Sequence, residues 1–390
     1  MKTGDQSVKV LHIASFHGNV GDSAMHDGAY RTRREDCPLA FDYTPLEVRE
    51  FFHWGQRKFD ADFVDYLNGF DLAIVGGLGA YQLWRADTAS GTCFDLAPDM
   101  LQRIEKPVIF YGLGCDASRG VDALAMDKFR RFLDVGYEKN FMFSLRNDGS
   151  QPILQEAVGA PHISPMPVIP DGGLFARPSI TPNEFAYHGE KIVAINLAGC
   201  MPDKRFATAA AGSPTLNEFA QGIALLGCDL LEAQQGVRLV FVPHIYSDLE
   251  LISNVLNRLP DEYRRRHVSV APYLNGGSNW SCIFDIYRQA SLVIGMRFHA
   301  CVVAIGMGTP VIGINTHHKI EGLFSDMQLS SDCIALSDET WLERLRLKSL
   351  GFIRSGEVMR PVYAEKVDNK RKELGAFHGD MLSWYLNWQV

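Results

Sequence analysis

The sequence predicts an α/β fold with two domains, each built on a mostly parallel sheet. Short, fully apolar strands alternate with helix-length segments, which is typical of parallel sheets covered on both faces. The alternation restarts after a segment rich in proline and glycine between residues 161 and 182. A chain of 390 residues is long enough for two cores. We therefore expect two Rossmann-like domains facing a cleft, with parallel sheets and helices on both faces.

The first half contains four apolar strands, each followed by glycine or polar residues, and a helix after the first strand. We assign these elements to an N-terminal domain of residues 1–175. The expected strands are 8–14, 71–75, 107–111 and 141–144, and the expected helix is 23–34.

The second half repeats this architecture without repeating the sequence. We assign residues 176–355 to a C-terminal domain and residues 356–390 to a helical segment that packs back on the domains. The expected strands are 191–197, 237–242, 268–270, 292–295 and 310–314, and the expected helices are 215–235, 248–259 and 281–289.

Composition excludes several classes of protein. The chain is 46% hydrophobic and 22% charged, which indicates a globular protein. A formal net charge of -8 argues against general nucleic-acid binding. The eight cysteines form no CxxC pair, which favours a reducing compartment and no metal framework. The N-terminus lacks the apolar core of a signal peptide, and no apolar run reaches the length of a membrane span, so we expect a cytoplasmic location. A homo-oligomer remains open.

The segment from Leu292 to Cys301 reads as a buried strand, a glycine turn and a helix, with Arg297 and His299 at the turn. The first N–H groups of a helix favour an anion, and arginine can grip carboxylate or phosphate with two hydrogen bonds. Histidine can transfer a proton near neutral pH. A surface salt bridge and a structural histidine are the alternatives. Lys319, after the next strand, adds a third cationic group and favours the functional interpretation.

Glycine-rich turns follow two strands of the first half. Asn19, Gly21 and Asp22 lie after the first strand, where Asp22 caps a helix, binds a sugar hydroxyl or acts as a base. Gly76 and Gly77 follow the second strand and indicate a close approach of the backbone to a ligand or to another chain segment. Neither turn matches GxGxxG, so the sequence gives little support to a dinucleotide site.

Two further positions each have a structural and a functional interpretation. Arg146 follows a strand and precedes Asp148; the pair is either a surface ion pair or part of a second anion clamp facing Arg297 across the cleft. His244 either orders its loop, with Asp248 capping a helix, or takes part in the site.

These motifs, in this order, resemble the polysaccharide pyruvyl transferase family over residues 8–330. The resemblance implies a GT-B-like fold and transfer of a pyruvyl group from phosphoenolpyruvate to sugar hydroxyls, usually as a cyclic ketal. It also implies donor binding and catalysis by Arg146, Arg297, Phe298 and His299. The matching motifs are Gly18-Asn19-Val20-Gly21-Asp22, the glycine cluster at 76–79, Ser144-Leu145-Arg146-Asn147-Asp148, Pro170-Asp171, Gly295-Met296-Arg297-Phe298-His299, and the strand 310–314 with Lys319.

Phosphoenolpyruvate carries a carboxylate and a phosphate, which suit two arginines and a helix N-terminus. In this scheme His299 is the general acid, Arg146 and Arg297 hold the anionic groups, and Lys319 assists. The remaining substrate-binding candidates are Asn19, Gly21, Asp22, Gly76, Gly77 and His244. The scheme needs no metal and no cofactor besides phosphoenolpyruvate as co-substrate. The expected partner is a saccharide or a lipid-linked glycan precursor in exopolysaccharide biosynthesis, which acts as the acceptor. We expect residues 1–175 to form the acceptor side and residues 176–355 the donor side. The segment 36–60 is a candidate for shaping the acceptor site.

Two alternatives stay open. A GT-B glycosyltransferase with a nucleotide-sugar donor also needs a cleft and cationic contacts to a diphosphate, but the sequence places no clear carboxylate for a ribose. A non-catalytic binding protein for an anionic saccharide would close on its ligand without releasing phosphate.

Overall fold

The computed structural model describes residues 7–180, 189–206, 212–275 and 277–388. Outside it lie the N-terminal residues used to argue against a signal peptide, the last two residues of the segment 161–182, and residues 389–390 of the C-terminal segment. The chain divides into two compact units: unit 1 is Met1–Phe16, Ala29–Asp171 and Lys370–Val390, and unit 2 is His17–Gly28 and Gly172–Asn369. The main boundary falls inside the proline- and glycine-rich segment. Helices α1 (Val20–Asp36) and α16 (Met359–Trp388) contribute residues to both units.

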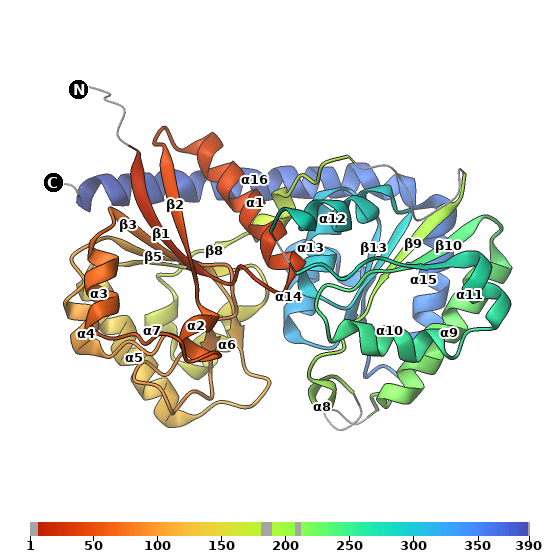
Figure 1. The fold of residues 1–390 in the computed structure, drawn as a ribbon, viewed down its shortest axis with the longest axis horizontal. Coiled ribbons are helices and arrows are strands. Elements are labelled where there is room, and N and C mark those ends of the chain that lie inside the picture. The colour runs from red at the N-terminus through yellow and green to blue at the C-terminus, as the bar shows by residue number, and fades with distance from the viewer. Residues whose placement is uncertain (1–6, 181–188, 207–211, 276, 389–390) are drawn as a thin grey trace. The chain divides into compact units, whose positions relative to one another are not determined.

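Unit 1 contains a six-stranded sheet in the order β2-β1-β3-β5-β7-β8, with every neighbouring pair parallel (Figure 1). A further two-stranded parallel sheet joins β4 (Tyr81–Gln82) to β6 (Cys115–Asp116). The six strands are β1 (Val8–Ala14), β2 (Phe41–Glu47), β3 (Leu72–Gly76), β5 (Val108–Leu113), β7 (Met142–Arg146) and β8 (Val168–Ile169).

Helices cover both faces of this sheet, because successive residues of a strand point to opposite faces. On β5, the Phe110 ring lies 5.5 Å from the Phe132 ring of α5, centroid to centroid, on one face. The next residue, Tyr111, lies on the other face, where its hydroxyl is 2.8 Å from Nε2 of His378 on α16. The other helices of unit 1 are α2 (Arg49–Phe52), α3 (Ala61–Asn68), α4 (Pro98–Gln102), α5 (Ala123–Glu138), α6 (Ser150–Ala157) and α7 (Ala160–Ile163).

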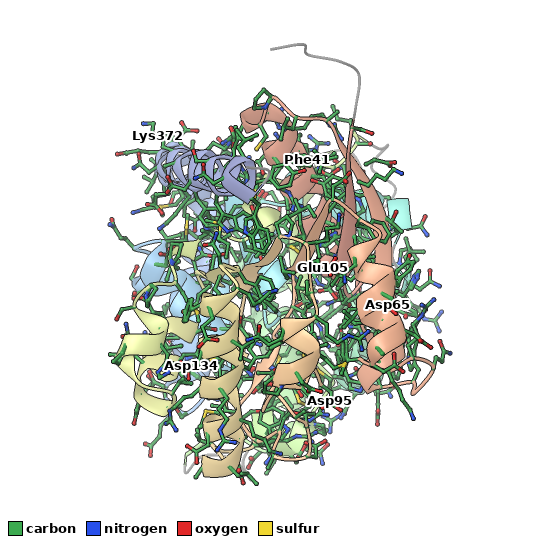
Figure 2. The ribbon with its side chains drawn as sticks, turned by 90° about the vertical axis from the view of Figure 1, so that its left-hand side faces the viewer. Phe41, Asp65, Asp95, Glu105, Asp134 and Lys372 are labelled. Carbon is green, nitrogen blue, oxygen red and sulfur yellow. The ribbon has the colours of Figure 1, made fainter. Side chains whose placement is uncertain are left out.

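Side-chain caps fix the starts of two of these helices. The carboxylates of Asp60 and Asp122 accept hydrogen bonds from backbone N–H groups in the first turns of α3 and α5. The outer faces of the same helices carry exposed acidic groups, including Asp65 and Asp134 (Figure 2).

Strand β2 lies in the segment 36–60, to which the sequence analysis assigned no element. It pairs with β1 alone and forms the edge of the sheet. An edge strand tolerates Pro45 because its N–H side need not join a second ladder. The strand was missed because it has no continuous apolar run, and the alternation that Phe41 and Tyr43 begin is short.

Unit 2 contains a second six-stranded, all-parallel sheet in the order β11-β10-β9-β12-β13-β14. Its strands are β9 (Lys191–Asn196), β10 (Val237–Phe241), β11 (Val268–Val270), β12 (Leu292–Gly295), β13 (Val311–Asn315) and β14 (Cys333–Ala335). Its helices are α8 (Pro202–Arg205), α9 (Leu216–Ala233), α10 (Asp248–Leu256), α11 (Asp261–His267), α12 (Trp280–Gln289), α13 (Phe298–Gly306), α14 (His318–Asp326) and α15 (Trp341–Ser355), with short 3₁₀ turns η1 (Gly172–Phe175), η2 (Gly277–Asn279), η3 (Ser330–Asp332) and η4 (Gly356–Val358).

The expected fold class is confirmed: two parallel sheets with helices, one in each Rossmann-like unit. The strand order of unit 2 matters for function, because β10, β9, β12 and β13 are neighbours. The carboxyl ends of adjacent parallel strands meet at one edge of a sheet, where ligands of α/β proteins bind. Across the described residues, no helix has both the length and the apolar character that a membrane crossing needs.

Candidate functional site

Arg297 lies directly beyond the carboxyl end of β12 and precedes the first turn of α13 in an extended conformation. Its backbone N–H donates to Oδ1 of Asn196 at 3.0 Å, and Nδ2 of Asn196 donates to the carbonyl of Val242 at 2.8 Å. Asn196 ends β9 and is fully buried. One amide therefore ties together the ends of three neighbouring strands. The sequence analysis passed over Asn196, although a polar residue that closes an apolar strand was a visible signal.

The guanidinium of Arg297 is held by a buried carboxylate. Nε donates to Oδ2 of Asp248 at 2.8 Å, and Nη2 donates to Oδ1. Asp248 is fully buried and accepts three more hydrogen bonds from the backbone N–H groups of Gly199, His244 and Ile245. Burial opposes ionisation of Asp248, but Arg297 and these N–H groups together lower its pKa. Arg297 is thus fixed in place by an ion pair that is buried, unlike a surface salt bridge.

His299, the second residue of α13, lies beside Asp22 in the first turn of α1. Its Nδ1 is 3.6 Å from Oδ1 of Asp22, and each residue is 8% exposed. The same Oδ1 accepts a hydrogen bond from Nδ2 of Asn19 at 2.9 Å, and Oδ1 of Asn19 accepts from the N–H of Gly21 at 3.0 Å. Asn19 and Asp22 therefore order the loop, and Asp22 is placed to orient the imidazole ring.

Gly21 is required by its distance to His299. A Cβ added at Gly21 would lie 2.5 Å from Cβ of His299, which is closer than real contacts allow. The glycine therefore permits the start of α1 to approach the catalytic candidate itself. Gly18, three residues earlier, has φ +81, and its N–H donates to the carbonyl of Asn275 at 2.8 Å.

His244 has the features of a structural histidine. It is fully buried, and its Nε2 is 2.9 Å from the hydroxyl of Tyr287. Burial lowers its pKa to about 3, with Asp248 opposing the shift and the charges of Arg297 and His299 adding to it. The ring is neutral near pH 7, which favours the interpretation that His244 orders its loop.

The two remaining candidates in unit 2 lie at helix starts. The Phe298 ring is 5.4 Å from the His299 ring, centroid to centroid, with the planes at 71°. The N–H of Lys319, in the first turn of α14, donates to Nδ1 of His317 at 3.4 Å. The Lys319 ammonium forms no ion pair within the part of the chain that the structure describes.

Arg146 ends β7 in unit 1 and is enclosed by carboxylates. Nε and Nη2 donate to Oδ2 of Asp148 at 2.9 and 2.8 Å, and Nη1 lies 3.6 Å from Oδ2 of Asp171. The side chains of all three are at most 5% exposed, so the cluster is buried and is no surface pair. A Cβ on Gly114 would lie 2.5 Å from Asp148, so the glycine makes room for the cluster. Arg146 and Arg297 belong to different units, and their expected pairing across a cleft stays a prediction.

The turn at Gly76 and Gly77 is shaped by the neighbouring strand. A Cβ at Gly76, the last residue of β3, would lie 3.1 Å from the carbonyl oxygen of Tyr111 on β5. Gly77 has φ +75, which favours glycine. A ligand role for these glycines remains a prediction.

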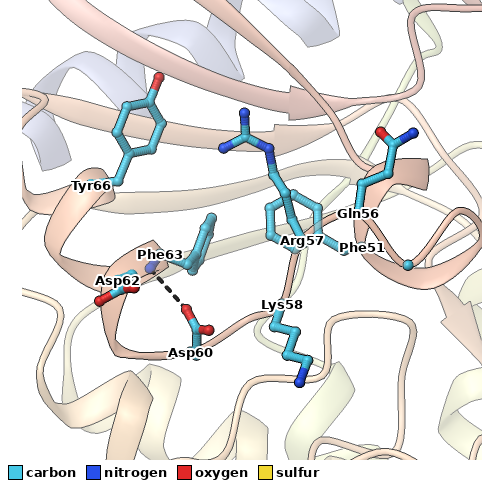
Figure 3. Close-up of a pocket in the computed structure, with 9 residues that line it drawn as sticks. Phe51, Gln56, Arg57, Lys58, Asp60, Asp62, Phe63 and Tyr66 are labelled. Carbon is cyan, nitrogen blue, oxygen red and sulfur yellow. Dashed lines mark hydrogen bonds between the residues drawn. The ribbon is translucent and has the colours of Figure 1, made fainter.

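Unit 1 also contains a pocket of about 430 Å³ at α2 and α3. It combines aromatic rings with cationic and acidic side chains, and Figure 3 shows Tyr66 and Phe63 on α3 and Lys58 on the preceding loop. Tyr66 is 44% exposed. The pocket overlaps the end of the segment 36–60 that the sequence analysis proposed for the acceptor. It is lined by Phe51, Gly55, Gln56, Arg57, Lys58, Asp60, Asp62, Phe63 and Tyr66.

A family model described as polysaccharide pyruvyl transferase matches residues 19–318. The chain belongs to this family. The match includes Asp22, Arg146, Arg297 and His299 and ends one residue before Lys319. A comparison with curated proteins finds no match. Among the described residues of this pyruvyl transferase family member, no group of three or more His, Cys, Asp or Glu side chains is placed to hold a metal ion.

Solved structures support a GT-B fold at low sequence identity. MnaA of S. aureus, in a co-structure with UDP, has a TM-score of 0.53 at 9% identity and covers 91% of each chain. HepE of Anabaena, in complex with UDP and glucose, has a TM-score of 0.52 at 11% identity, and the match covers 96% of this chain and 100% of the HepE chain. The N-terminal domain of a Candida albicans trehalose-6-phosphate phosphatase has a TM-score of 0.52 at 12% identity, covering 98% and 100%. At such identities the likeness concerns the fold alone.

Proposed function

We propose that this protein transfers the pyruvyl group of phosphoenolpyruvate to hydroxyl groups of a saccharide or lipid-linked glycan, forming a pyruvate ketal and releasing phosphate. Membership of the polysaccharide pyruvyl transferase family supports the class of reaction. The observation that carries the proposal is the His299–Asp22 pair, at 3.6 Å, on the helix that begins directly after Arg297. An anion-binding group and a proton-transfer group thus lie within one unit.

His299 would supply the proton that starts the reaction. Asp22 lies near Nδ1 and orients the ring, so that the protonated imidazole can deliver its Nε2 proton to the methylene carbon of phosphoenolpyruvate. The resulting cationic centre at the neighbouring carbon is attacked by a sugar hydroxyl. The neutral imidazole accepts the proton of this hydroxyl. A second hydroxyl then displaces phosphate and closes the ketal, and its proton leaves with the phosphate.

Arg297 would hold an anionic group of the donor. Its Nη1 donates no hydrogen bond to any residue that the structure describes, so this nitrogen is available to a carboxylate or phosphate oxygen. The N–H groups of the first turn of α13 and the helix dipole favour the same charge. The ion pair with Asp248 fixes the guanidinium group of Arg297 before the donor binds. Binding therefore costs less side-chain conformational entropy.

For the acceptor we propose the pocket in unit 1. Aromatic faces and polar side chains together are typical of sites that take sugars, whose rings have apolar faces and hydroxyl edges. Tyr66 presents a partly exposed ring, while Lys58 and Asp62 supply donors and acceptors (Figure 3). Tyr66→Ala should raise the KM for the acceptor and leave the KM for the donor unchanged, whereas Tyr263→Ala in unit 2 should change neither.

Phosphate release tests the reaction directly. The protein is incubated with phosphoenolpyruvate and candidate sugars, and inorganic phosphate is measured against a His299→Gln control. Release that needs both substrates and is lost in the control supports the proposal. Thermal shift separates the alternatives: stabilisation by nucleotide-sugars and not by phosphoenolpyruvate would favour a GT-B glycosyltransferase. Saccharide binding with no phosphate release would favour a binding protein.

A further inference from the structure

Unit 2 contains a second arginine beside Arg297 that the reaction scheme does not use. Arg205, the last residue of α8, donates from Nη1 to the hydroxyl of Thr316 at 2.8 Å and from Nε to the carbonyl of Cys200 at 2.9 Å. Its Nη2 lies 3.6 Å from the Sγ of Cys200. Cys200 follows β9 and Thr316 follows β13, so this group extends the site along the same edge of the sheet.

The thiol of Cys200 lies between two guanidinium groups. Nη2 of Arg297, the other arginine, lies 3.4 Å from the same Sγ. Burial by itself would raise the pKa of this thiol, but Arg297 and Arg205 outweigh burial and lower it. Burial and the like charge of Arg297 lower the pKa of Arg205, with Cys200 opposing them.

The charges of this cluster do not balance without the thiolate. Asp248 neutralises Arg297 through two hydrogen bonds. Within the described residues, no carboxylate lies within ion-pair distance of Arg205, whose three nitrogens donate to a hydroxyl, a carbonyl and a sulfur. A largely desolvated cation without a carboxylate partner is unfavourable unless another anion is near. The Sγ of Cys200, which lies 3.4 Å and 3.6 Å from nitrogens of the two arginines, is a group of the chain that can supply an anion there by losing its proton.

We propose that Arg205 and Arg297 form a dianion site for a phosphate group, and that the Cys200 thiolate is the resident counter-ion which the phosphate replaces. When a phosphate dianion binds, Cys200 takes up one proton from solvent and becomes a neutral thiol, so the net charge of the two arginines, Asp248, Cys200 and the ligand is -1 and not -2. This places the phosphate of the donor, or the phosphate product, beside Arg205. The inference rests on the proposed function only for the source of the phosphate.

Alkylation of Cys200 tests the site. Iodoacetamide forms a bond from the thiolate sulfur to its methylene carbon and releases iodide, and mass spectrometry of the Cys200 peptide gives the rate. Saturating inorganic phosphate should slow alkylation about tenfold, while sodium chloride of equal ionic strength should not. Equal rates with phosphate and chloride would overturn the proposal. Protection by phosphoenolpyruvate at lower concentration than by inorganic phosphate would assign the site to the donor; the reverse order would assign it to the product.

Variants separate the roles of the two residues. Arg205→Gln should weaken phosphate protection about tenfold and Arg205→Lys less, whereas Arg265→Gln, which removes an exposed arginine of α11, should change nothing. Unchanged protection in Arg205→Gln would contradict the proposal. Cys200→Ser should still bind phosphate at least as tightly as the native protein, and a tenfold loss would show that the sulfur is a ligand instead of a counter-ion.

Sulfate provides the proton test, because it is a dianion that does not titrate between pH 6 and 9. The charged groups against Cys200 are Arg205 and Arg297, with Asp248 bound to Arg297. His299, two residues from Arg297, is present in the native protein and in Cys200→Ser alike, so the difference between the two proteins reports the thiol. Sulfate affinity should therefore fall more steeply with rising pH in the native protein than in Cys200→Ser. The same pH dependence in both would overturn the counter-ion role. Phosphate protection without turnover of phosphoenolpyruvate would support this site and refute the proposed function, and turnover with full activity in Arg205→Gln would do the opposite.

Discussion

Arg146 in unit 1 and Arg297 in unit 2 occupy similar places on their sheets, yet their surroundings differ in charge. Arg146 is enclosed by two buried carboxylates, those of Asp148 and Asp171. Arg297 has one carboxylate partner, and a second arginine and a thiol lie beside it. A cation outnumbered by carboxylates is suited to holding a fold together, whereas a cluster with a surplus of cations attracts an anion. An arginine after a strand therefore has no fixed role, and its counter-charges decide what it does.

The largest expected difference concerns stability. Arg146→Met should lower the free energy of unfolding by about 3–5 kcal/mol, because it leaves two buried carboxylates without their cation. Arg297→Met should cost less, since Asp248 keeps three backbone N–H donors. Urea unfolding followed by circular dichroism measures both. A larger loss of stability in Arg297→Met than in Arg146→Met would contradict the comparison. A raised KM for phosphoenolpyruvate in an Arg146→Lys protein of native stability would show that Arg146 takes part in donor binding.

The second prediction concerns chemistry. His299→Gln should lower kcat about 10²- to 10⁴-fold, the usual contribution of a general acid, with little change in unfolding midpoint. Asp22→Asn should reduce kcat less, because the imidazole remains and loses only the carboxylate that is placed to orient it. Phosphate release under saturating substrates measures both. Near-native kcat in His299→Gln would move the proton transfer to another residue.

Two glycines give a matched test in the two units. The Cβ added in Gly21→Ala would clash with His299, and the Cβ added in Gly114→Ala would clash with Asp148 and Arg146. In each case the added Cβ would lie 2.5 Å from its nearest neighbouring atom. Each should destabilise by about 1–3 kcal/mol. Only Gly21→Ala should lower kcat in the protein that remains folded. Gly351→Ala, in α15 with open space around it, is the control and should be neutral or stabilising.

The last prediction concerns how the free energy of unfolding depends on pH. The pKa of His244 is lowered to about 3 in the folded protein, against about 6.5 unfolded, mainly by burial. The unfolded chain therefore binds a proton first, and stability is lost as pH falls from about 6.5 towards 3, at about 1 kcal/mol per pH unit. His244→Gln should show a shallower decline between pH 7 and 5 in urea titrations. An unchanged slope would mean that other groups dominate.

Strands buried on both faces were predictable from the sequence, and the site geometry was not. β1, β11 and β12 have the expected bounds, and the other predicted strands differ by one or two residues at an end, since a run of valine and isoleucine between polar residues is a local signal. β2, β8 and β14 were not predicted; all three are edge strands of the six-stranded sheets, and an edge strand carries a weaker pattern. Arg297 and His299 were found from their position at a turn. Asn196, Asp248 and Arg205 were not assigned to the site, because their importance comes from partners far along the chain.

Residues 17–28 belong to unit 2, although most of the chain around them belongs to unit 1. During synthesis on the ribosome, Asp22 therefore emerges long before α13, which carries His299. The pair of Asp22 and His299 can form only after most of the chain has been made. A fragment cut at the linker and expressed from Gly172 onward would carry the second sheet but lack the carboxylate at Nδ1. A single cut before Gly172 therefore does not separate the two units, because residues 17–28 of unit 2 stay with the N-terminal fragment.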